Sequence, residues 1–304
     1  MDIPVLHVEG ETLAEAYERA LVALRKRGVP LRTQYDRPGD PPSLDATLNL
    51  TVRRPTADPM IHKAFPGGIE DLREYVMELQ GAKDHWVKNV NDPADTRWEY
   101  TYHGRLARYG AWRETREGRS VEAGPFVVPQ IERVIEKLVR QPFTRQAQMI
   151  TWMPNLDLDC YDPPCLQSLW YRILEDAEGR AWLNTNIRFR SNDAWGASFM
   201  NLFGFIRFTR EVIADAIAQR TGRPVELGRL NWQADSYHIY GKDLAEAEQR
   251  LFRRIETTAF EDRVYRLDDP AIRELYDEAE AEVRAKIRAY DDEHPEPGRE
   301  GGLR

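Results

Sequence analysis

Apolar residues recur at helical spacing in five stretches of the chain. In residues 11–27, Leu13, Ala16, Leu21 and Leu24 fall on one face, as residues three and four positions apart do in an α-helix. Glycine or proline, which interrupt helices, follow several of these stretches. The pattern predicts helices over residues 11–27, between Gly68 and Gly81, from Pro129 to Leu138, and over residues 200–219 and 270–290.

Strands are predicted where apolar and polar residues alternate. The clearest case is residues 181–190, and residues 46–52 and 146–153 also have strand-like sequences. The face of 181–190 expected to be buried carries Leu183, Thr185, Ile187 and Phe189.

Interspersed helices and strands predict an α/β protein. No internal repeat or clear linker divides the chain, so we expect a single domain over residues 1–304. Residues 82–128 are rich in aromatic residues and show no clear pattern. Residues 291–304 are charged and rich in proline and glycine, and we expect a disordered tail there.

Composition narrows the classes of partner. The net charge of -8 argues against a dedicated nucleic-acid binder, because phosphate backbones favour basic surfaces. No apolar run approaches the roughly 18 residues of a membrane span, and the N-terminus lacks the pattern of a secretory signal. The two cysteines, Cys160 and Cys165, do not have zinc-site spacing. We expect a cytoplasmic protein with reduced thiols, no metal, no nucleic acid and no membrane partner.

Cys165 is the first candidate for chemistry. It follows Pro163-Pro164, which stiffen the backbone, between two strand-like segments. A catalytic cysteine acts as the thiolate, and nearby cations lower the pKa of a thiol. Arg145 upstream and the cluster at residues 188–193 downstream could supply such cations or bind a phosphate. The alternative is a small buried side chain with no reactivity.

Further residues stand at fixed distances from Cys165. Arg145 lies seven residues before Trp152, and Cys165 lies thirteen after it; Asn201 lies eight after Asp193. The ordered set comprises Glu74 to Gly81, Gln130-Ile131, Thr144-Arg145, Trp152, Pro164-Cys165, Arg190 to Asp193, Asn201 and His238-Ile239-Tyr240. This order resembles the thymidylate synthase family, which includes the pyrimidine nucleotide hydroxymethylases, over roughly residues 70–245.

The resemblance implies a role for each residue at the nucleotide. Cys165 would attack C6 of a pyrimidine nucleoside monophosphate and so make C5 nucleophilic. Asn201 would read the O4 and N3 edge of the base through its amide. The phosphate would be bound by Arg190 and Ser191 and by Arg145 from a partner subunit, and the sugar hydroxyl by His238 and Tyr240.

The resemblance also implies the groups that act with the second substrate. Asp193 would contact the pterin of 5,10-methylenetetrahydrofolate. Glu74 would organise water and proton transfer at the base, and Tyr102 would match a tyrosine near the cysteine. Each has a plain structural alternative: a solvated helix face for Glu74, a buried amide for Asn201, a turn or helix cap for residues 191–193, and an ordinary strand for residues 238–240.

The implied fold is a mixed sheet covered by helices on one face, with the bare face packed on a second copy in a homodimer. Some residues depart from the family pattern. Leu166 follows Cys165 where many members have histidine, a feature shared with shorter archaeal-type members, as is the run Asn201 to Gly204. Ser236 occupies a position that is usually acidic.

Two reactions fit these residues, and a third class remains as a minor alternative. In the first, dUMP is methylated to dTMP, with the folate donating carbon and hydride. In the second, a pyrimidine nucleotide is hydroxymethylated; the polar stretch Glu300 to Arg304 favours this, because an apolar peptide closes thymidylate synthase sites against water. Asn201 favours uracil and hence the first reaction. The third class is a non-catalytic nucleotide-binding or RNA-binding relative, which the presence of Cys165 and Glu74 opposes.

Overall fold

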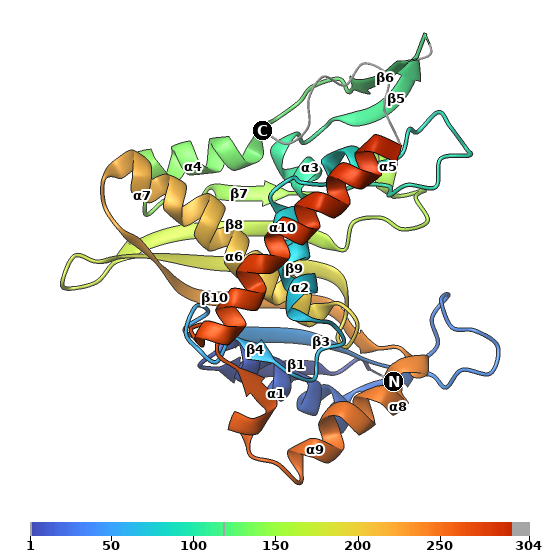
Figure 1. Cartoon of the computed structure of the whole chain (residues 1–304), viewed down its shortest axis with the longest axis vertical. Coiled ribbons are helices and arrows are strands. Elements are labelled where there is room, and N and C mark those ends of the chain that lie inside the picture. Colours follow the sequence, from blue (N-terminus) through green and yellow to red (C-terminus); the bar gives the residue numbers. More distant parts are fainter. Residues whose placement is uncertain (1, 118, 294–304) are drawn as a thin grey trace.

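A mixed seven-stranded sheet runs through the centre of the molecule (Figure 1). The computed structural model describes residues 2–117 and 119–293. The strands of the sheet are β1 (Val5–Gly10), β2 (Val29–Leu31), β3 (Ser43–Val52), β7 (Ala147–Ile150), β8 (Leu166–Glu175), β9 (Ala181–Asp193) and β10 (Val225–Ile239). Their order is β1-β3-β10-β9-β8-β7, and β2 also pairs with β3. The pairs β1–β3 and β9–β10 are parallel and the others antiparallel. The three predicted strands fall on β3, β7 and β9.

Helices cover one face of this sheet. Side chains along β9 alternate between buried and partly exposed positions, beginning with buried Ala181. In this buried series the ring of Phe189 packs against that of Phe205 in α6 (Ser198–Phe208), 6.0 Å away. Helix α1 (Leu13–Arg27) contacts α6 and covers β1 and β3. The opposite series, which includes exposed Arg188, has no helix over it in the described part of the chain. This arrangement confirms the predicted mixed sheet with helices.

The predicted helices are present, with one interruption. Besides α1 they are α2 (Ile69–Leu79), α4 (Gln130–Arg140) and α10 (Pro270–Glu293). The continuous helix expected over residues 200–219 is instead α6, a π-helical turn (Thr209–Ala214) and α7 (Asp215–Thr221). Gly222 ends α7 with a φ of 68°, a left-handed conformation that glycine adopts readily.

Residues 82–128, which gave no clear pattern, form short elements held by long-range polar contacts. The Asp84 carboxylate accepts a hydrogen bond from Thr101 at 2.5 Å and lies 2.6 Å from the Nδ1 atom of His103. Such contacts leave no periodic trace in a sequence. The elements are a 3-10 turn (Asp84–Trp86), α3 (Tyr102–Ala107) and the hairpin β5 (Trp112–Arg116) and β6 (Arg119–Ala123), which projects at the top of Figure 1.

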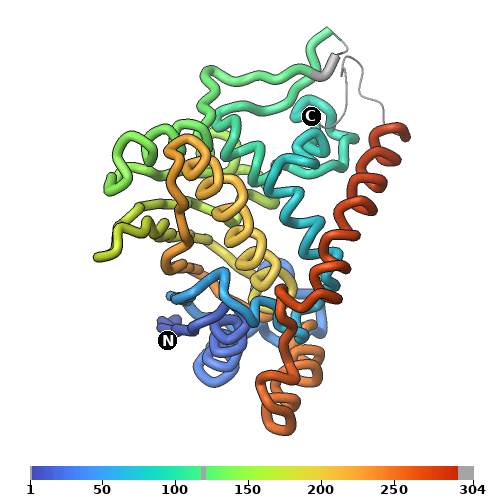
Figure 2. Tube along the Cα trace, turned by 60° about the vertical axis from the view of Figure 1, so that its left-hand side comes forward, coloured from blue at the N-terminus to red at the C-terminus, as the bar shows by residue number. Residues whose placement is uncertain are grey.

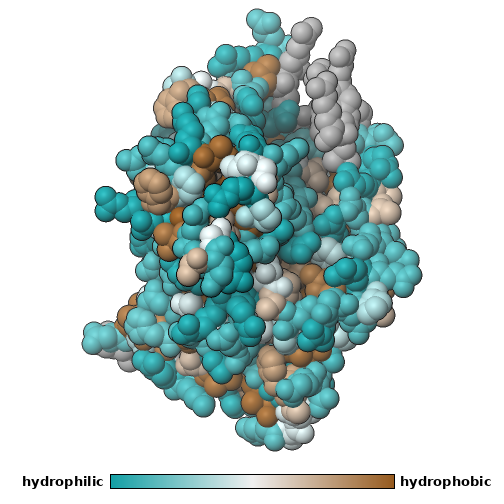
Figure 3. Space-filling model, turned by 90° about the vertical axis from the view of Figure 1, so that its left-hand side faces the viewer, coloured by the Kyte–Doolittle hydropathy of each residue, from teal (hydrophilic) through white to brown (hydrophobic). Residues whose placement is uncertain are grey.

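Helix α10 runs along the flank of the molecule beside α2 (Figure 2). It continues to Glu293, so residues 291–293, which were predicted to be disordered, are helical. The rest of the predicted tail lies outside the described residues. No helix in the described ranges is long and apolar enough to cross a membrane. The face shown in Figure 3 is mainly hydrophilic, with hydrophobic side chains in separate patches.

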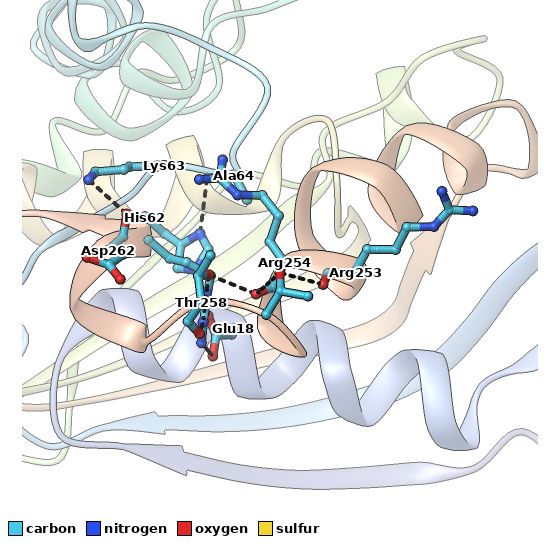
Figure 4. A network of polar contacts seen from close by, with 10 residues as sticks. Glu18, His62, Lys63, Ala64, Arg253, Arg254, Thr258 and Asp262 are labelled. Carbon is cyan, nitrogen blue, oxygen red and sulfur yellow. Dashed lines mark hydrogen bonds and ion pairs between the residues drawn. The ribbon is translucent and has the colours of Figure 1, made fainter.

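Glu18 connects α1 to His62 in a short strand and to Arg263 in a 3-10 turn (Phe260–Arg263); Figure 4 shows this region. The Nε2 atom of His62 lies 2.9 Å from Glu18, while its Nδ1 atom accepts a hydrogen bond from the Ala64 amide at 3.1 Å. Arg263 donates two hydrogen bonds of 2.8 Å to the same carboxylate. The remaining α-helices and strands are β4 (Ile61–His62), α5 (Pro154–Asp157), α8 (Leu244–Ala247), α9 (Arg253–Ile255) and β11 (Val264–Tyr265).

Candidate active site

Cys165 lies where β8 begins, directly after Pro163 and Pro164. The Arg190 guanidinium donates hydrogen bonds to the carbonyl oxygens of Pro163, at 2.6 Å, and Pro164, at 3.1 Å. The Arg190 amide donates to the Cys165 carbonyl at 2.8 Å. Three contacts from β9 and two proline rings therefore fix the backbone that presents the thiol.

The thiol is protonated in the free protein. Burial raises the pKa of Cys165, and although Arg190 lowers it, Asp162 raises it further. Of the arginines in the same chain, Arg190 is the one that lowers the pKa of the thiol. Arg188 pairs with Asp235 at 3.0 Å, and Arg145 is exposed. One cation is not enough to outweigh burial.

Two phenols from residues 82–128 lie beside Cys165. The Tyr100 hydroxyl lies near the backbone of Cys165, and the Tyr102 hydroxyl lies near that of Leu166. The two rings are 5.6 Å apart between centroids, and the Tyr102 ring packs against Phe189 at 6.1 Å. Burial raises the pKa of both phenols, so both are proton donors at neutral pH. Tyr102 was predicted from the sequence; Tyr100 was missed because its segment has no periodicity.

Asn201 lies in the first turn of α6 and is 8% exposed. The Tyr75 hydroxyl of α2 donates a short hydrogen bond to its Oδ1 atom. Gly204, one turn further along α6, makes room for this ring: a Cβ atom there would lie 2.6 Å from a Tyr75 ring carbon. Tyr75 lies within the helix predicted between Gly68 and Gly81, and the sequence pattern gave no sign of this contact.

The end of β10 presents a chain of polar side chains. The Nδ1 atom of His238 lies 3.1 Å from the Ser236 hydroxyl, which donates to Asp45 of β3 at 2.6 Å. The buried Nε2 atom of His238 has no partner in the described part of the protein. Asp45 thus supplies a carboxylate beside Ser236, where the family pattern led us to expect an acidic residue within β10 itself. Burial raises the pKa of Asp45.

The ring of Tyr240 lies 4.7 Å from that of His238. Burial, with smaller contributions from Asp193, Tyr35 and Cys165, raises the pKa of Tyr240 to about 12. Its phenol is therefore neutral at pH 7, and it lies close enough to Cys165 for a thiolate there to raise its pKa. The predicted sugar-binding pair thus lies on the Cys165 side of the molecule.

Asp193 ends β9 and faces His238 in the parallel pairing of the two strands. Its Oδ1 atom accepts hydrogen bonds from the amides of Trp195, at 3.0 Å, and Gly196, at 2.9 Å. The Oδ2 atom accepts none in the described residues. Ser191, two positions earlier, faces Ser236. Asp193 therefore both caps the turn before α6 and offers a second oxygen to a ligand.

Two of the carboxylates on α2, those of Glu74 and Glu78, share one lysine. Lys83 lies 2.6 Å from Glu74 and 3.6 Å from Glu78, and Lys286 of α10 lies 3.6 Å from Glu74. Burial opposes the ionisation of Glu74, but the lysines outweigh it and lower its pKa, whereas burial raises the pKa of Glu78. The sequence indicated Glu74 and missed Glu78, one helical turn away; such opposed shifts are common in acid–base sites.

Two cavities flank this constellation. One of about 450 Å³ adjoins Tyr100 and is lined by Lys88, Arg108 and Glu122 among others. A second of about 250 Å³ adjoins Tyr240 and Lys242. Within the described ranges, no group of three or more His, Cys, Asp or Glu side chains could hold a metal ion.

These features define an α/β protein with a mixed sheet and a cysteine held at the start of a strand. The chain belongs to the thymidylate synthase family, whose family model matches residues 77–290. It is 28% identical over 236 residues to a protein of Methanosarcina barkeri named "Putative thymidylate synthase", covering 78% of this chain and 90% of that protein. A protein of the same name from Methanocaldococcus jannaschii is 27% identical over 244 residues, covering 78% and 91%.

The fold agrees with a solved structure of this family. The thermostable thymidylate synthase A from Bacillus subtilis superposes with a TM-score of 0.55 at 18% identity, covering 79% of this chain and 84% of that one. The likeness concerns the arrangement of the sheet and helices, which the sequence predicted as a family resemblance.

Proposed function

We propose that the protein transfers one carbon from 5,10-methylenetetrahydrofolate to C5 of a pyrimidine nucleoside monophosphate, and that its reaction is the methylation of dUMP. The observation that carries this proposal is the position of Cys165. It is fixed by Arg190 on one side, faced by neutral phenols on the other, and flanked by strand ends that carry Asp193 and His238. Membership of the thymidylate synthase family supports the same reaction.

The nucleotide would lie against the ends of β9 and β10. Arg190 and Ser191 would bind the phosphate, the guanidinium as a bidentate donor. The free Nε2 atom of His238 and the Tyr240 phenol would bind the sugar hydroxyl. Because the Ser236 hydroxyl donates to Asp45, it can accept from His238, which leaves Nε2 as an acceptor for that hydroxyl.

The Cys165 sulfur would form a bond to C6, and the C5–C6 electron pair would shift towards O4 and make C5 nucleophilic. The thiol must lose its proton first. Binding the phosphate dianion at Arg190 would not assist this loss, so a nearby base has to take the proton. Tyr100, Tyr102 and Asn201 would stabilise the charge on the ring through their hydrogen-bond donors. The one-carbon unit would add at C5, the C5 proton would be lost as the bond from that carbon to the folate nitrogen breaks, and hydride from the folate would reduce the C5 methylene to a methyl group as Cys165 is expelled.

The folate would supply the one-carbon unit and the hydride. The site has a suitable contact for it, since the Oδ2 atom of Asp193 accepts no hydrogen bond in the described residues and could accept one from the pterin. Glu74 and Glu78, with Lys83 between them, would hold and move protons near the base.

Arg145 would bind the nucleotide phosphate in the active site of a second copy of the chain. It is exposed at the sheet, on the end away from its own Cys165 loop, and a pair of bare sheet faces would bring it to the partner's phosphate site. Mixing Arg145→Ala and Cys165→Ala subunits tests this arrangement. Recovery of part of the activity in the mixture supports a shared site, whereas no recovery from a confirmed mixed dimer contradicts it.

A set of parallel incubations tests the reaction. The purified protein is mixed with methylenetetrahydrofolate and, separately, dUMP, UMP, dCMP and CMP, and the nucleotide products are weighed by mass spectrometry, with Cys165→Ala as the control. A methyl gain on dUMP together with dihydrofolate supports the proposal. A hydroxymethyl gain on any nucleotide means the alternative reaction, and the absence of any product contradicts both.

A further inference from the structure

We propose that Tyr75 locks the amide of Asn201 in one orientation and thereby makes the site selective for uracil over cytosine. This inference rests on the proposed function, because it concerns the base that Asn201 would read. The contact joins two packed helices, α2 and α6, and it involves a residue to which the sequence analysis assigned no role in the site.

The hydrogen bond sets which end of the amide is available. The Tyr75 hydroxyl donates to the Oδ1 atom of Asn201. The Nδ2 atom of Asn201 has no hydrogen-bond partner among the described residues. It is not one of their fully buried, unpaired polar atoms, so a ligand can reach it. The amide therefore offers a donor to a ligand. Uracil carries an acceptor, O4, at the position where cytosine carries an amino group, so the donor matches uracil.

Reversing the amide would leave a proton without an acceptor. After a flip, Nδ2 would face the phenol, which would have to accept rather than donate. Within the described part of the chain the Tyr75 hydroxyl has no other partner, so its own proton would have nowhere to go. Burial raises the pKa of Tyr75, so the phenol does not escape this cost by ionising. An unpaired polar group in a buried site is costly.

The sequence of α6 preserves this geometry. Gly204 gives the Tyr75 ring a notch, because a Cβ atom at that position would lie 2.6 and 2.7 Å from two ring carbons and 2.9 Å from Leu79. The ring can therefore lie across α6 and place its hydroxyl at Asn201. A methyl group at residue 204 would push the ring away from the amide.

The test compares dissociation constants for dUMP and dCMP, measured by calorimetry without folate, in the wild type, Tyr75→Phe and Gly204→Ala. Tyr75→Phe removes the hydroxyl and keeps the ring in its notch. We expect the preference for dUMP to fall about tenfold, the value of one hydrogen bond, and to fall in Gly204→Ala also. Tyr237→Phe is the matched control, because it removes a hydroxyl that lies 3.2 Å from Ser198, in the same turn of α6.

A structural defect would weaken the binding of dUMP and dCMP alike. A change in the ratio of their two dissociation constants therefore reports on the positioning role of Tyr75. An unchanged ratio in Tyr75→Phe overturns the inference and leaves the proposed function standing. A wild type that prefers dCMP overturns the inference and also contradicts dUMP as the substrate, while one-carbon transfer to a pyrimidine nucleotide still stands. If the wild type binds none of the four nucleotides dUMP, dCMP, UMP and CMP, the proposed function itself fails. A loss of selectivity in Tyr237→Phe equal to that in Tyr75→Phe also overturns the inference.

Discussion

Replacing Glu18 by glutamine removes the charge that joins His62 and Arg263, and we expect it to destabilise the protein at neutral pH. Burial opposes the ionisation of Glu18, but hydrogen bonds from His62 and Arg263 outweigh it and lower its pKa from an ordinary 4.5 to about 2. Lowering a pKa by one corresponds to about 1.4 kcal/mol, so the folded state gains about 3 kcal/mol when the carboxylate is ionised. The loss expected on breaking a buried ion pair is of the same size.

The direction of the pH dependence follows from the lowered pKa. A carboxylate with a depressed pKa in the folded state contributes its full stabilisation above the unfolded-state value, and this is lost as the pH falls from about 4.5 towards 2. The difference between the wild type and Glu18→Gln should therefore be largest at pH 7 and shrink steadily as the pH is lowered below 5.

Urea unfolding of both proteins at one protein concentration, from pH 7 down to pH 3, measures this difference. Glu248→Gln is the control, because its ion pair with Arg25, at 2.8 Å, is exposed. Exposed pairs contribute about 0–1 kcal/mol. The reasoning fails if Glu18→Gln costs no more than this control at pH 7, or if its cost is the same at every pH.

The remaining predictions concern the candidate site. Cys165→Ser should abolish turnover while dUMP binding, measured by calorimetry, persists; normal turnover would contradict the covalent mechanism. Because burial raises the pKa of Cys165, its alkylation by iodoacetamide at pH 7 should be slower than that of free cysteine and should rise with pH, which peptide mass spectrometry can follow; fast, pH-independent alkylation would contradict a protonated thiol. Asn201→Asp should shift the preference in turnover from uracil towards cytosine nucleotides, and an unchanged preference would exclude Asn201 from base reading.

Periodic segments were predictable, and long-range contacts were not. The helix ending before Gly81 and the alternating strand at residues 181–190 follow from local spacing, which the sequence carries directly. The π-helical turn at residues 209–214 is invisible to a pattern with a single helical period. The predicted helix therefore ran through it without a break.

The candidate site shows the same limit. The spacing around Cys165 located the cysteine and the ends of two strands, because motif residues lie close together in the chain. Asp45 reaches Ser236 only through the pairing of β3 with β10, and Tyr75 reaches Asn201 only through the packing of α2 on α6. A single sequence records neither contact.

The parallel pairing of β9 with β10 gives one side of the site a fixed spacing. Asp193 and His238 are register partners, and neighbouring strands in a sheet stay about 4.8 Å apart. The groups assigned to the folate and to the sugar therefore cannot move independently of each other. The two strand ends therefore form one rigid side of the site, on which the contacts to both substrates would keep the same separation throughout the reaction.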